Sequence, residues 1–377
     1  MKCRRCGNED PSYFFYGSKG IYCRKCIRFS RLLLEEELAE FDYTVSSDVY
    51  EYTFSYELTK DQKEASEKCR LALKQNDVLL HCVCGAGKTE ISVASISDYL
   101  QEGLKVAYAI PRKEVVIELA QRFQTIFPKA QVTAVYGSHH EQLSGDLIVC
   151  TCHQLYRYYR TFDLLILDEA DAYPLKGDEA LMNIALSSCK GRFLFSTATI
   201  DPQLEKILAQ RKITKVELFV RPSLKPLSIP KLILLPEGLS FLYLLRLMAL
   251  TTNRCIIFVA SKKKCELFYR ICHIFYSCTY VYSDLEQRKE NIEAFRKGNY
   301  RFLFSTTVME RGITIKGISV IIFHEPYTFD SSSLVQMLGR VGRGMEDDEG
   351  KSYLFARRKD KEIDRTLRLL KSANERL

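Results

Sequence analysis

The segment that most constrains the fold of this chain lies at residues 78–100, where an apolar run passes through a turn of small residues into a helical pattern. The run Val78–Val83 is followed by Cys84, the sequence Gly-Ala-Gly-Lys-Thr and a helical segment, Glu90–Leu100. In a parallel α/β sheet such a loop lies at the carboxyl end of its strand, where backbone N–H groups and the helix N-terminus can surround a phosphate. The segment therefore predicts an α/β fold with a nucleotide site.

Each position of this loop has an expected role in holding ATP and Mg²⁺. Gly85 and Gly87 let the backbone approach the phosphates. Lys88 reaches the β- and γ-phosphates, and the Thr89 hydroxyl ligates the metal. The full pattern has glycine where this chain has Cys82. The assignment therefore depends on the motifs that follow.

A second apolar run, Leu164–Leu167, ends in acidic residues. The carboxyl end of a buried parallel strand is where such a sheet binds ligands. Asp168 is expected to hold Mg²⁺ at the nucleotide, and Glu169 to orient and deprotonate the attacking water. A solvated loop is the alternative for an acidic cluster alone, but the pairing with the phosphate loop favours catalysis.

Gln62 lies upstream of both motifs, just before the phosphate-binding segment. An amide can both donate to and accept from the edge of adenine, so Gln62 is a candidate nucleotide contact. A helix cap formed with Thr59 is the competing interpretation, and the two can coexist.

Apolar runs alternate with amphipathic segments through the rest of the chain, which indicates βαβ units and parallel sheets. Strands are expected at Val78–Val83, Lys105–Ile110, Val132–Tyr136, Leu147–Cys150, Leu164–Leu167 and Arg192–Ser196, and then at Cys255–Val259, Thr279–Tyr282, Arg301–Ser305 and Val320–Phe323. Charged helical segments are expected at about Arg31–Glu40 and from about Arg358 onward.

Three prolines between Arg221 and Pro230 indicate an extended connector. The expected organisation is a small module with its connector over residues 1–50, a first α/β lobe over 51–222 and a second over 223–377, which ends in the charged helix.

Four cysteines near the N-terminus have the spacing of a zinc site. Cys3-x-x-Cys6 and Cys23-x-x-Cys26 are separated by sixteen residues, which suits two thiolate turns that close one tetrahedral Zn²⁺ site around a short hairpin. A structural zinc is the default interpretation, because so short a segment cannot build its own core. The other ten cysteines are expected to be small apolar filler.

This N-terminal tip also carries most of the net charge. Residues 1–31 contain eight basic and two acidic side chains, so +6 of the chain's +8 lies there. Four thiolates on one Zn²⁺ reduce this to about +4. The basic residues alternate with aromatic ones, which suits phosphate and base contacts, although the rings can instead pack over the hairpin. The aromatic residues are Tyr13, Phe14, Phe15, Tyr16 and Tyr22.

The chain has no uncharged apolar run of about 18 residues, and its N-terminus lacks the apolar stretch of a secretory signal. Fourteen cysteines in a chain of this size suit a reducing compartment. The expectation is a cytoplasmic protein.

The motifs and their order resemble those of superfamily 2 helicases. The residues within the motifs are similar to those of the late-competence ComFA family over nearly the whole chain. The first half carries Cys82-Val-Cys-Gly-Ala-Gly-Lys-Thr-Glu90, Ile110-Pro-Arg-Lys-Glu-Val-Val116, Thr151-Cys-His-Gln-Leu155, Asp168-Glu-Ala-Asp-Ala-Tyr173 and Ser196-Thr-Ala-Thr199. The second half carries Ile257-Phe-Val259, Tyr282-Ser-Asp284, Ser305-Thr-Thr-Val-Met-Glu-Arg-Gly-Ile-Thr314 and Gln336-Met-Leu-Gly-Arg-Val-Gly-Arg343.

The resemblance implies two RecA-like lobes in tandem behind the zinc module. Arg340 and Arg343 of the second lobe are then expected to neutralise the γ-phosphate, and Gly312 to contribute to nucleotide binding. Backbone and hydroxyl contacts to a single strand, which carry no sequence information, are implied for Arg112, Gly137, Thr151, His153, Gln154, Ser283, Thr306 and Thr307.

By the same resemblance, the expected activity is ATP-dependent translocation of single-stranded DNA during uptake in natural transformation. The implied partners are a membrane DNA-uptake channel and a phosphoribosyltransferase-like competence protein, with a place at the inner face of the cell membrane; homo-oligomerisation stays open. Three alternatives remain: a DEAD-type RNA helicase, a primosomal DNA helicase, and an ATPase switch on a zinc-ribbon scaffold. Gln336 stands where the RNA helicases begin with His-Arg, which disfavours the first.

Overall fold

The computed structural model describes residues 1–45, 51–307, 315, 317–342 and 350–376. The chain divides into two compact units, which are described separately. The first unit comprises residues 1–82 and 87–218, and the second comprises residues 83–86 and 219–377. Within the described ranges, no helix is long and apolar enough to cross a membrane.

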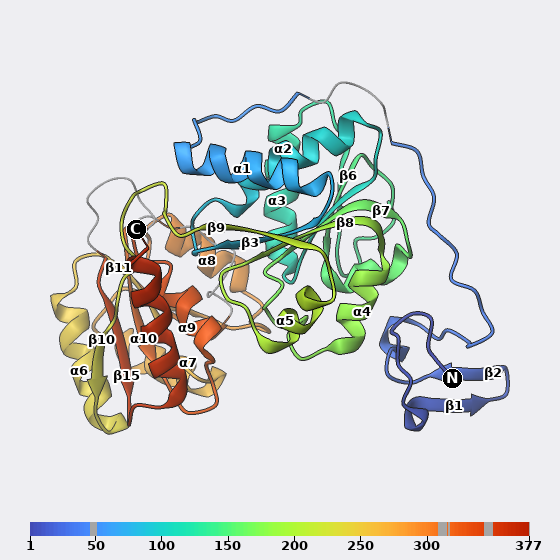
Figure 1. Ribbon diagram of the computed structural model, residues 1–377. Helices are drawn as coiled ribbons and strands as arrows, with labels where there is room; N and C mark the ends of the chain where they lie inside the picture. Colours follow the sequence, from blue (N-terminus) through green and yellow to red (C-terminus); the bar gives the residue numbers. More distant parts are fainter. Residues whose placement is uncertain (46–50, 308–314, 316, 343–349, 377) are drawn as a thin grey trace. The chain divides into compact units, whose positions relative to one another are not determined.

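The first unit is built on a seven-stranded sheet whose neighbouring strands are all parallel (Figure 1). The strand order is β5-β6-β4-β7-β8-β3-β9. The strands are β3 (Asp77–Cys82), β4 (Val106–Ile110), β5 (Val132–Val135), β6 (Leu147–Thr151), β7 (Phe162–Asp168), β8 (Cys189–Thr197) and β9 (Ile213–Leu218). Most of their side chains are buried, as expected for a sheet covered on both faces.

Helices cover both faces of this sheet. They are α1 (Lys60–Leu73), α2 (Lys88–Gln101), α3 (Lys113–Ile126), α4 (Glu179–Ser187) and α5 (Pro202–Ala209), with a 3₁₀ segment, η3 (Cys152–Arg157). Successive side chains of β4 point to opposite faces of the sheet and so join different parts of the core. Tyr108 packs on Phe123 of α3, with ring centroids 5.2 Å apart, whereas Ala107 and Ala109 join the apolar cluster of α4, α5 and η3.

The N-terminal module is a hairpin flanked by two short 3₁₀ turns. Its elements are η1 (Pro11–Tyr13), β1 (Phe14–Gly17), β2 (Gly20–Cys23) and η2 (Ile27–Phe29). The two strands are antiparallel, and Phe14 pairs with Cys23. The buried residues of the module belong to the same apolar cluster as α4 and η3 of the first unit.

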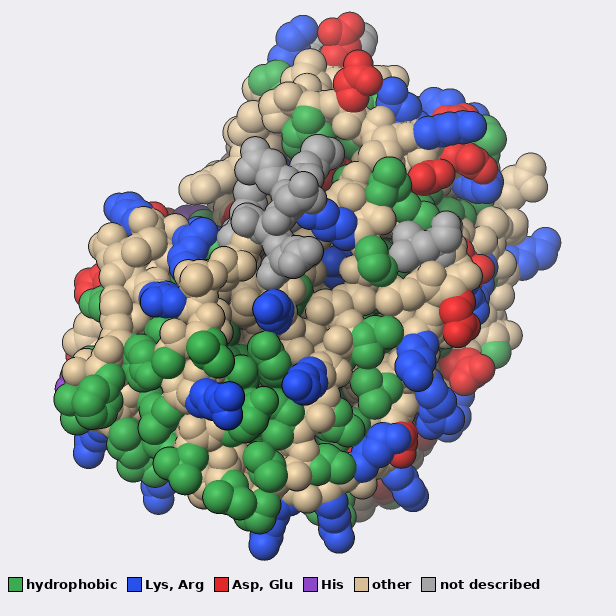
Figure 2. Space-filling view, turned by 90° about the vertical axis from the view of Figure 1, so that its left-hand side faces the viewer, with side chains coloured by type: hydrophobic (Ala, Val, Ile, Leu, Met, Phe, Trp, Pro, Cys, Tyr) green, Lys and Arg blue, Asp and Glu red, His purple; other side chains and the backbone are tan. Residues whose placement is uncertain are grey.

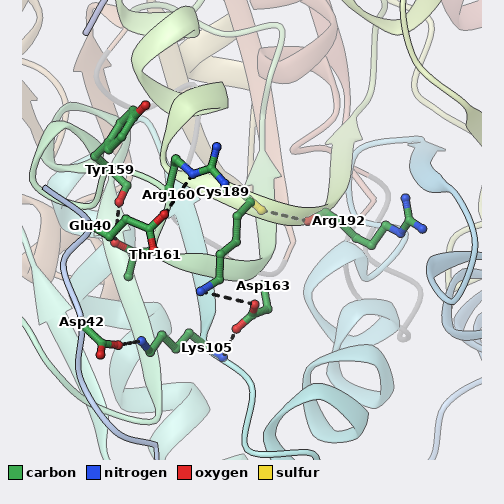
Figure 3. A network of polar contacts seen from close by, with 10 residues as sticks. Glu40, Asp42, Lys105, Tyr159, Arg160, Thr161, Asp163, Cys189 and Arg192 are labelled. Atoms are coloured by element: carbon green, nitrogen blue, oxygen red, sulfur yellow. Dashed lines mark hydrogen bonds and ion pairs between the residues drawn. The ribbon is translucent and has the colours of Figure 1, made fainter. Parts of the chain in front are cut away.

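The helix expected at Arg31–Glu40 is not formed, so that prediction is wrong. Leu33 bridges to Tyr22, and the Leu34 amide donates to the carbonyl of Ile21, so the chain is held along the hairpin. The following acidic residues bind the body of the first unit instead of helical neighbours: Glu40 accepts from Arg160, and Asp42 pairs with Lys105 (Figure 3). Tertiary contacts thus override the local helix propensity.

The second unit has a six-stranded parallel sheet in the order β10-β15-β14-β11-β13-β12. Its strands are β10 (Lys231–Leu234), β11 (Arg254–Phe258), β12 (Cys278–Val281), β13 (Phe302–Ser305), β14 (Ile318–Phe323) and β15 (Ser352–Ala356). The helices are α6 (Glu237–Leu250), α7 (Lys262–Cys272), α8 (Arg288–Arg296), α9 (Ser331–Leu338) and α10 (Lys361–Asn374). α6 and α7 cover a core that includes Ile257 and Phe304.

All ten expected strands are present with bounds shifted by a few residues, and two parallel-sheet lobes with an N-terminal four-cysteine module are confirmed. Three strands were not expected: β9, β10 and β15. β9 and β10 are edge strands of their sheets. Exposed Lys215 and Glu217 interrupt the apolar run of β9, and β10 is only four residues long.

Candidate nucleotide, nucleic-acid and metal sites

The phosphate loop bends through two left-handed glycines before α2 begins at Lys88. Gly85 has φ +84° and Gly87, the N-cap of α2, has φ +89°. A side chain at Gly87 would also clash with the amide nitrogen of Gln62. The left-handed backbone conformation therefore favours glycine at Gly87, whereas the contact with the end of the Gln62 side chain can be relieved by a shift of that side chain.

Gln62 is buried in the first turn of α1 and forms a reciprocal cap with Thr59. The Gln62 amide N–H donates to Thr59 Oγ1 over 3.3 Å, and Gln62 Oε1 accepts from the Thr59 N–H over 3.0 Å. The capping interpretation is confirmed. The same side chain also lies beside Gly87. It is therefore placed at the phosphate loop, and its contact with adenine stays a prediction.

Asp168 ends β7 and is only 6% exposed. The Tyr108 hydroxyl donates to Oδ2 over 2.9 Å, and the Ser196 hydroxyl and the Glu169 amide each donate to Oδ1 over 2.9 Å. Burial raises the pKa of Asp168; the Lys88 charge opposes this increase, and Glu169 adds to it. The carboxylate is thus desolvated and fixed in orientation, as suits a metal ligand.

Tyr108 was not singled out in the sequence, and Ser196 was named there only as the first residue of a motif, without a contact to Asp168. Tyr108 lies within the apolar run of β4, where only its burial was expected. β4 and β8 are the neighbours of β7 on either side, so the sheet order brings both hydroxyls to Asp168. Sequence spacing alone does not show which strands are neighbours.

A second set of contacts links the acidic motif to Ser196-Thr-Ala-Thr199. The Thr199 hydroxyl donates to Asp171, and Thr197 Oγ1 accepts from the Thr199 amide over 3.2 Å. With the Ser196–Asp168 bond and the backbone bond from the Ala170 amide to the Ser196 carbonyl over 3.3 Å, the two motifs are joined at several points.

Four of the five nucleic-acid candidates in the first half gather at one edge of the first sheet. Arg112, Gly137 and Thr151 lie at or just beyond the carboxyl ends of β4, β5 and β6, which are adjacent. Gln154 Nε2 donates to the Gly137 carbonyl over 3.5 Å. Asp168 lies at the end of the next strand, β7, so these residues share an edge with the nucleotide site.

The fifth candidate, His153, lies against the N-terminal module. Its ring centroid is 6.2 Å from that of Phe29. The pKa of His153 is lowered mainly by burial and to a smaller extent by the nearby positive charge of Arg28. Tyr156, one turn farther along η3, also packs on Phe29 at 5.6 Å. Sequence reasoning did not anticipate this position.

The candidates of the second half lie at the carboxyl ends of two neighbouring strands of the second unit. Ser283 follows β12, and Thr306 and Thr307 follow β13. Arg340 follows α9 and is 1% exposed. Gly312 and Arg343 lie outside the described residues.

Arg221, which was expected only as part of a connector, is buried and braces the segment around Arg340. Its Nη2 donates to the Gly339 carbonyl over 3.0 Å and its Nη1 to the Val341 carbonyl over 2.8 Å. The side chain is 2% exposed. A charged residue beside several prolines was not a signal for burial, so sequence reasoning missed it.

The four N-terminal cysteines converge. All four are buried, and their sulfur atoms lie within 4.8 Å of one another. Cys3 Sγ and Cys26 Sγ are 3.7 Å apart, as are Cys6 Sγ and Cys23 Sγ. A tetrahedral Zn²⁺ with Zn–S bonds of about 2.3 Å requires sulfur separations of about 3.8 Å. The donor set and its geometry fit zinc.

The module is attached to the first unit through α4 and η3. Arg28 pairs with Asp178, the N-cap of α4, and Lys25 Nζ lies 3.3 Å from Glu179. Asn183 Nδ2 donates to the carbonyl of Cys6, one of the cysteines, over 2.9 Å. A turn of the four-cysteine cluster is thus bonded directly to the helix that follows the acidic motif.

Comparison with known proteins agrees with this geometry. Residues 59–207 match the DEAD/DEAH box helicase family and residues 239–345 match the helicase conserved C-terminal domain. The fold is similar to that of S. cerevisiae Dbp5 bound to RNA and ADP BeF3, with a TM-score of 0.66 at 19% identity, covering 85% of this chain and 88% of that one.

Two curated relatives match over most of their length. Competence protein ComFA of Bacillus subtilis is 29% identical, covering 99% of this chain and 86% of the relative. Competence protein ComFA of Streptococcus pneumoniae is 31% identical, covering 94% and 85%. With the helicase motifs and the buried four-cysteine cluster in place, the chain belongs to the ComFA family and is a helicase-like ATP-hydrolysing enzyme.

Proposed function

We propose that this protein is a motor that pulls single-stranded DNA with energy from ATP hydrolysis. One observation carries the proposal: Arg112, Gly137 and Thr151 lie at the same sheet edge as Asp168, on adjacent strands. The strand that leads to Arg112, β4, is directly adjacent to β7, so no strand lies between Asp168 and the first of the residues that would hold DNA. Backbone and hydroxyl contacts at that edge suit a strand of any sequence.

In this proposal, the first lobe (51–222) binds and hydrolyses ATP. Lys88 would hold the β- and γ-phosphates, and Thr89 and Asp168 would hold Mg²⁺, which would supply positive charge to the phosphates. Glu169 orients the attacking water and accepts its proton. The left-handed conformations of Gly85 and Gly87 and the three donors on Asp168 support this assignment.

The second lobe (223–377) supplies positive charge to the reaction. Arg340 and Arg343 neutralise the γ-phosphate, with Gly312 at the nucleotide, once the lobes close on ATP. The bonds Ser196–Asp168 and Thr199–Asp171 transmit the state of the nucleotide to the adjoining motif. Ser283, Thr306 and Thr307 hold the strand from this lobe, and alternate closing and opening moves it in steps.

The biological setting follows from the relatives, which are competence proteins. We assign the motor to DNA uptake in natural transformation, at the cytoplasmic face of the membrane channel, with a phosphoribosyltransferase-like protein as partner. An RNA substrate is the second candidate, because Dbp5 has a similar fold and was solved with RNA. Family membership at 31% identity favours DNA over that fold likeness at 19%.

The test is steady-state ATP turnover of the full chain with single-stranded DNA, duplex DNA, RNA or no nucleic acid. Lys88→Ala is the blank, since it removes the phosphate contact. Strong stimulation by single-stranded DNA alone is expected. Preference for RNA would replace the proposal with an RNA helicase, and turnover indifferent to every nucleic acid would indicate a partner-controlled switch.

A further inference from the structure

Two helices of the second unit, α6 and α7, expose large apolar side chains on their outer sides. The exposed fractions are 62% for Leu242, 69% for Leu250, 67% for Ile274 and 72% for Phe275. The other members of this surface are Leu239, Leu267 and Ile271. On α6 the spacing is i, i+3, i+11 and on α7 with its C-terminal extension i, i+4, i+7, i+8, so each set forms one stripe.

The two stripes belong to one continuous surface, which we call the α6–α7 surface. Phe241 of α6 packs on Phe268 of α7 with ring centroids 4.7 Å apart, and the Tyr276 hydroxyl donates to the Leu245 carbonyl over 3.0 Å. These contacts fill the seam between the helices. The apolar side chains therefore stand on the outer surface of the two helices and do not line a groove between them.

The charges within this surface have one sign. Arg246 of α6 and Lys263 and Arg270 of α7 are exposed at helical spacing from the apolar residues, and they form no ion pair within the described part of the chain. Each helix contains a single acidic residue, and each has a partner: Glu237 pairs with Lys264, and Glu266 accepts from the Tyr282 hydroxyl. Figure 2 shows apolar side chains gathered with basic ones scattered among them.

The combination of exposed apolar side chains and basic ones favours some binding partners of the α6–α7 surface over others. In a symmetric contact with a second copy, the same basic residues would face one another, which opposes association. A partner helix needs a groove, and the seam is filled by Phe241 and Phe268. An anionic lipid surface satisfies both features, because apolar side chains enter the acyl boundary while Arg and Lys remain at the phosphates.

We propose that the α6–α7 surface binds the anionic surface of a lipid bilayer. The inference deepens the proposed location at the membrane and does not require ATP turnover. Each basic residue near such a surface contributes about a fivefold gain in partitioning. Several inserted apolar side chains add to this gain and make binding depend on both apolar contact and charge.

The test is flotation of the full chain, without ATP or DNA, with vesicles of equal parts phosphatidylcholine and phosphatidylglycerol. Wild-type protein is expected to float with these vesicles and not with phosphatidylcholine alone. Leu242→Ser and Arg270→Gln are each expected to lower the partition coefficient by about fivefold or more. Both residues are exposed, so the variants should retain the DNA-stimulated ATP turnover of the wild type.

Matched control variants distinguish binding by the α6–α7 surface from nonspecific binding of the protein to vesicles. Leu71→Ser removes a leucine that is 54% exposed on α1, and Arg365→Gln removes an exposed arginine on α10; neither is expected to change flotation. Failure of the wild type to float, or equal loss in the controls, overturns the proposal. So does a concentration-dependent dimer that Leu242→Ser dissociates, since the surface would then join two copies. Loss of ATP turnover with intact flotation would count against the motor alone.

Discussion

Asp168 is the residue whose environment says most about the chemistry. Three donors hold its two oxygens, and one of them, Tyr108, is fully buried among apolar residues. Burying a hydroxyl group costs free energy unless the hydroxyl forms a hydrogen bond inside the protein. Its partner here is a carboxylate at the proposed metal, so Tyr108 acts on the metal through Asp168.

We expect Tyr108→Phe to raise the Mg²⁺ concentration needed for half-maximal ATP turnover by about tenfold, because the residues that orient a metal ligand affect metal affinity by about 10–100-fold. The measurement is a Mg²⁺ titration of ATP turnover. Tyr276→Phe is the control, because it removes a hydroxyl that binds the Leu245 carbonyl in the second unit. An unchanged Mg²⁺ requirement in Tyr108→Phe would show that Ser196 and the Glu169 amide suffice.

Among the elements, α4 links the N-terminal four-cysteine module to the acidic motif. Its N-cap, Asp178, accepts from the Leu181 amide over 3.0 Å and pairs with Arg28 of the module. Burial would raise the pKa of Asp178, but the bonds from Arg28 and Leu181 outweigh it and hold the pKa below its usual value. One carboxylate thus begins a helix and attaches the module.

Because the pKa of Asp178 is lowered in the folded state, its stabilising contribution is present above its unfolded pKa and is lost as the pH falls through the folded value. We expect Arg28→Gln to increase tryptic cleavage after Lys25 and Arg31, sites that the variant and the wild type share, by about two- to fivefold near neutral pH, as for a partly exposed ion pair of up to about 1 kcal/mol. Lys68→Gln, which breaks an exposed pair with Glu64 on α1, is the control. Equal cleavage of Arg28→Gln and wild type would mean that Phe29 and Asn183 alone attach the module.

At the scale of the whole molecule, each lobe places its chemistry at the carboxyl ends of parallel strands. The first sheet brings the nucleotide residues and the nucleic-acid candidates to adjacent strands. The second holds Arg340 on a segment braced by Arg221, a residue that lies more than a hundred positions earlier in the chain. The second unit therefore depends on Arg221, near the start of its segment 219–377, for the placement of Arg340.

We expect Arg221→Gln to destabilise the second unit by about 2–4 kcal/mol, because its buried charge-assisted hydrogen bonds to the carbonyls of Cys84, Gly339 and Val341 are lost. It should also lower ATP turnover, since Gly339 and Val341 flank Arg340. Urea unfolding and ATP turnover measure the two effects. Ser223→Ala, which removes a single 3.4 Å bond to the Gly342 carbonyl, should cost less than about 1 kcal/mol. Similar stability of both variants would refute the brace.

The sequence by itself determined the class of fold, the strands of the two sheets apart from three, and the residues of the phosphate loop, the acidic motif and the four-cysteine cluster. These features are local: a strand followed by Gly85–Thr89, or two cysteine pairs, has a conformation and a chemistry set by neighbouring residues. The helix expected at Arg31–Glu40 was wrong because distant contacts, such as that of Glu40 with Arg160, replaced helical ones.

The tertiary structure alone decided which strands are neighbours, and with that the donors on Asp168. It also decided that His153 packs on Phe29, that Arg221 is buried, and that the stripes of α6 and α7 join in one exposed surface. These are long-range properties, and the periodicity of one segment carries no information about the segment that packs against it.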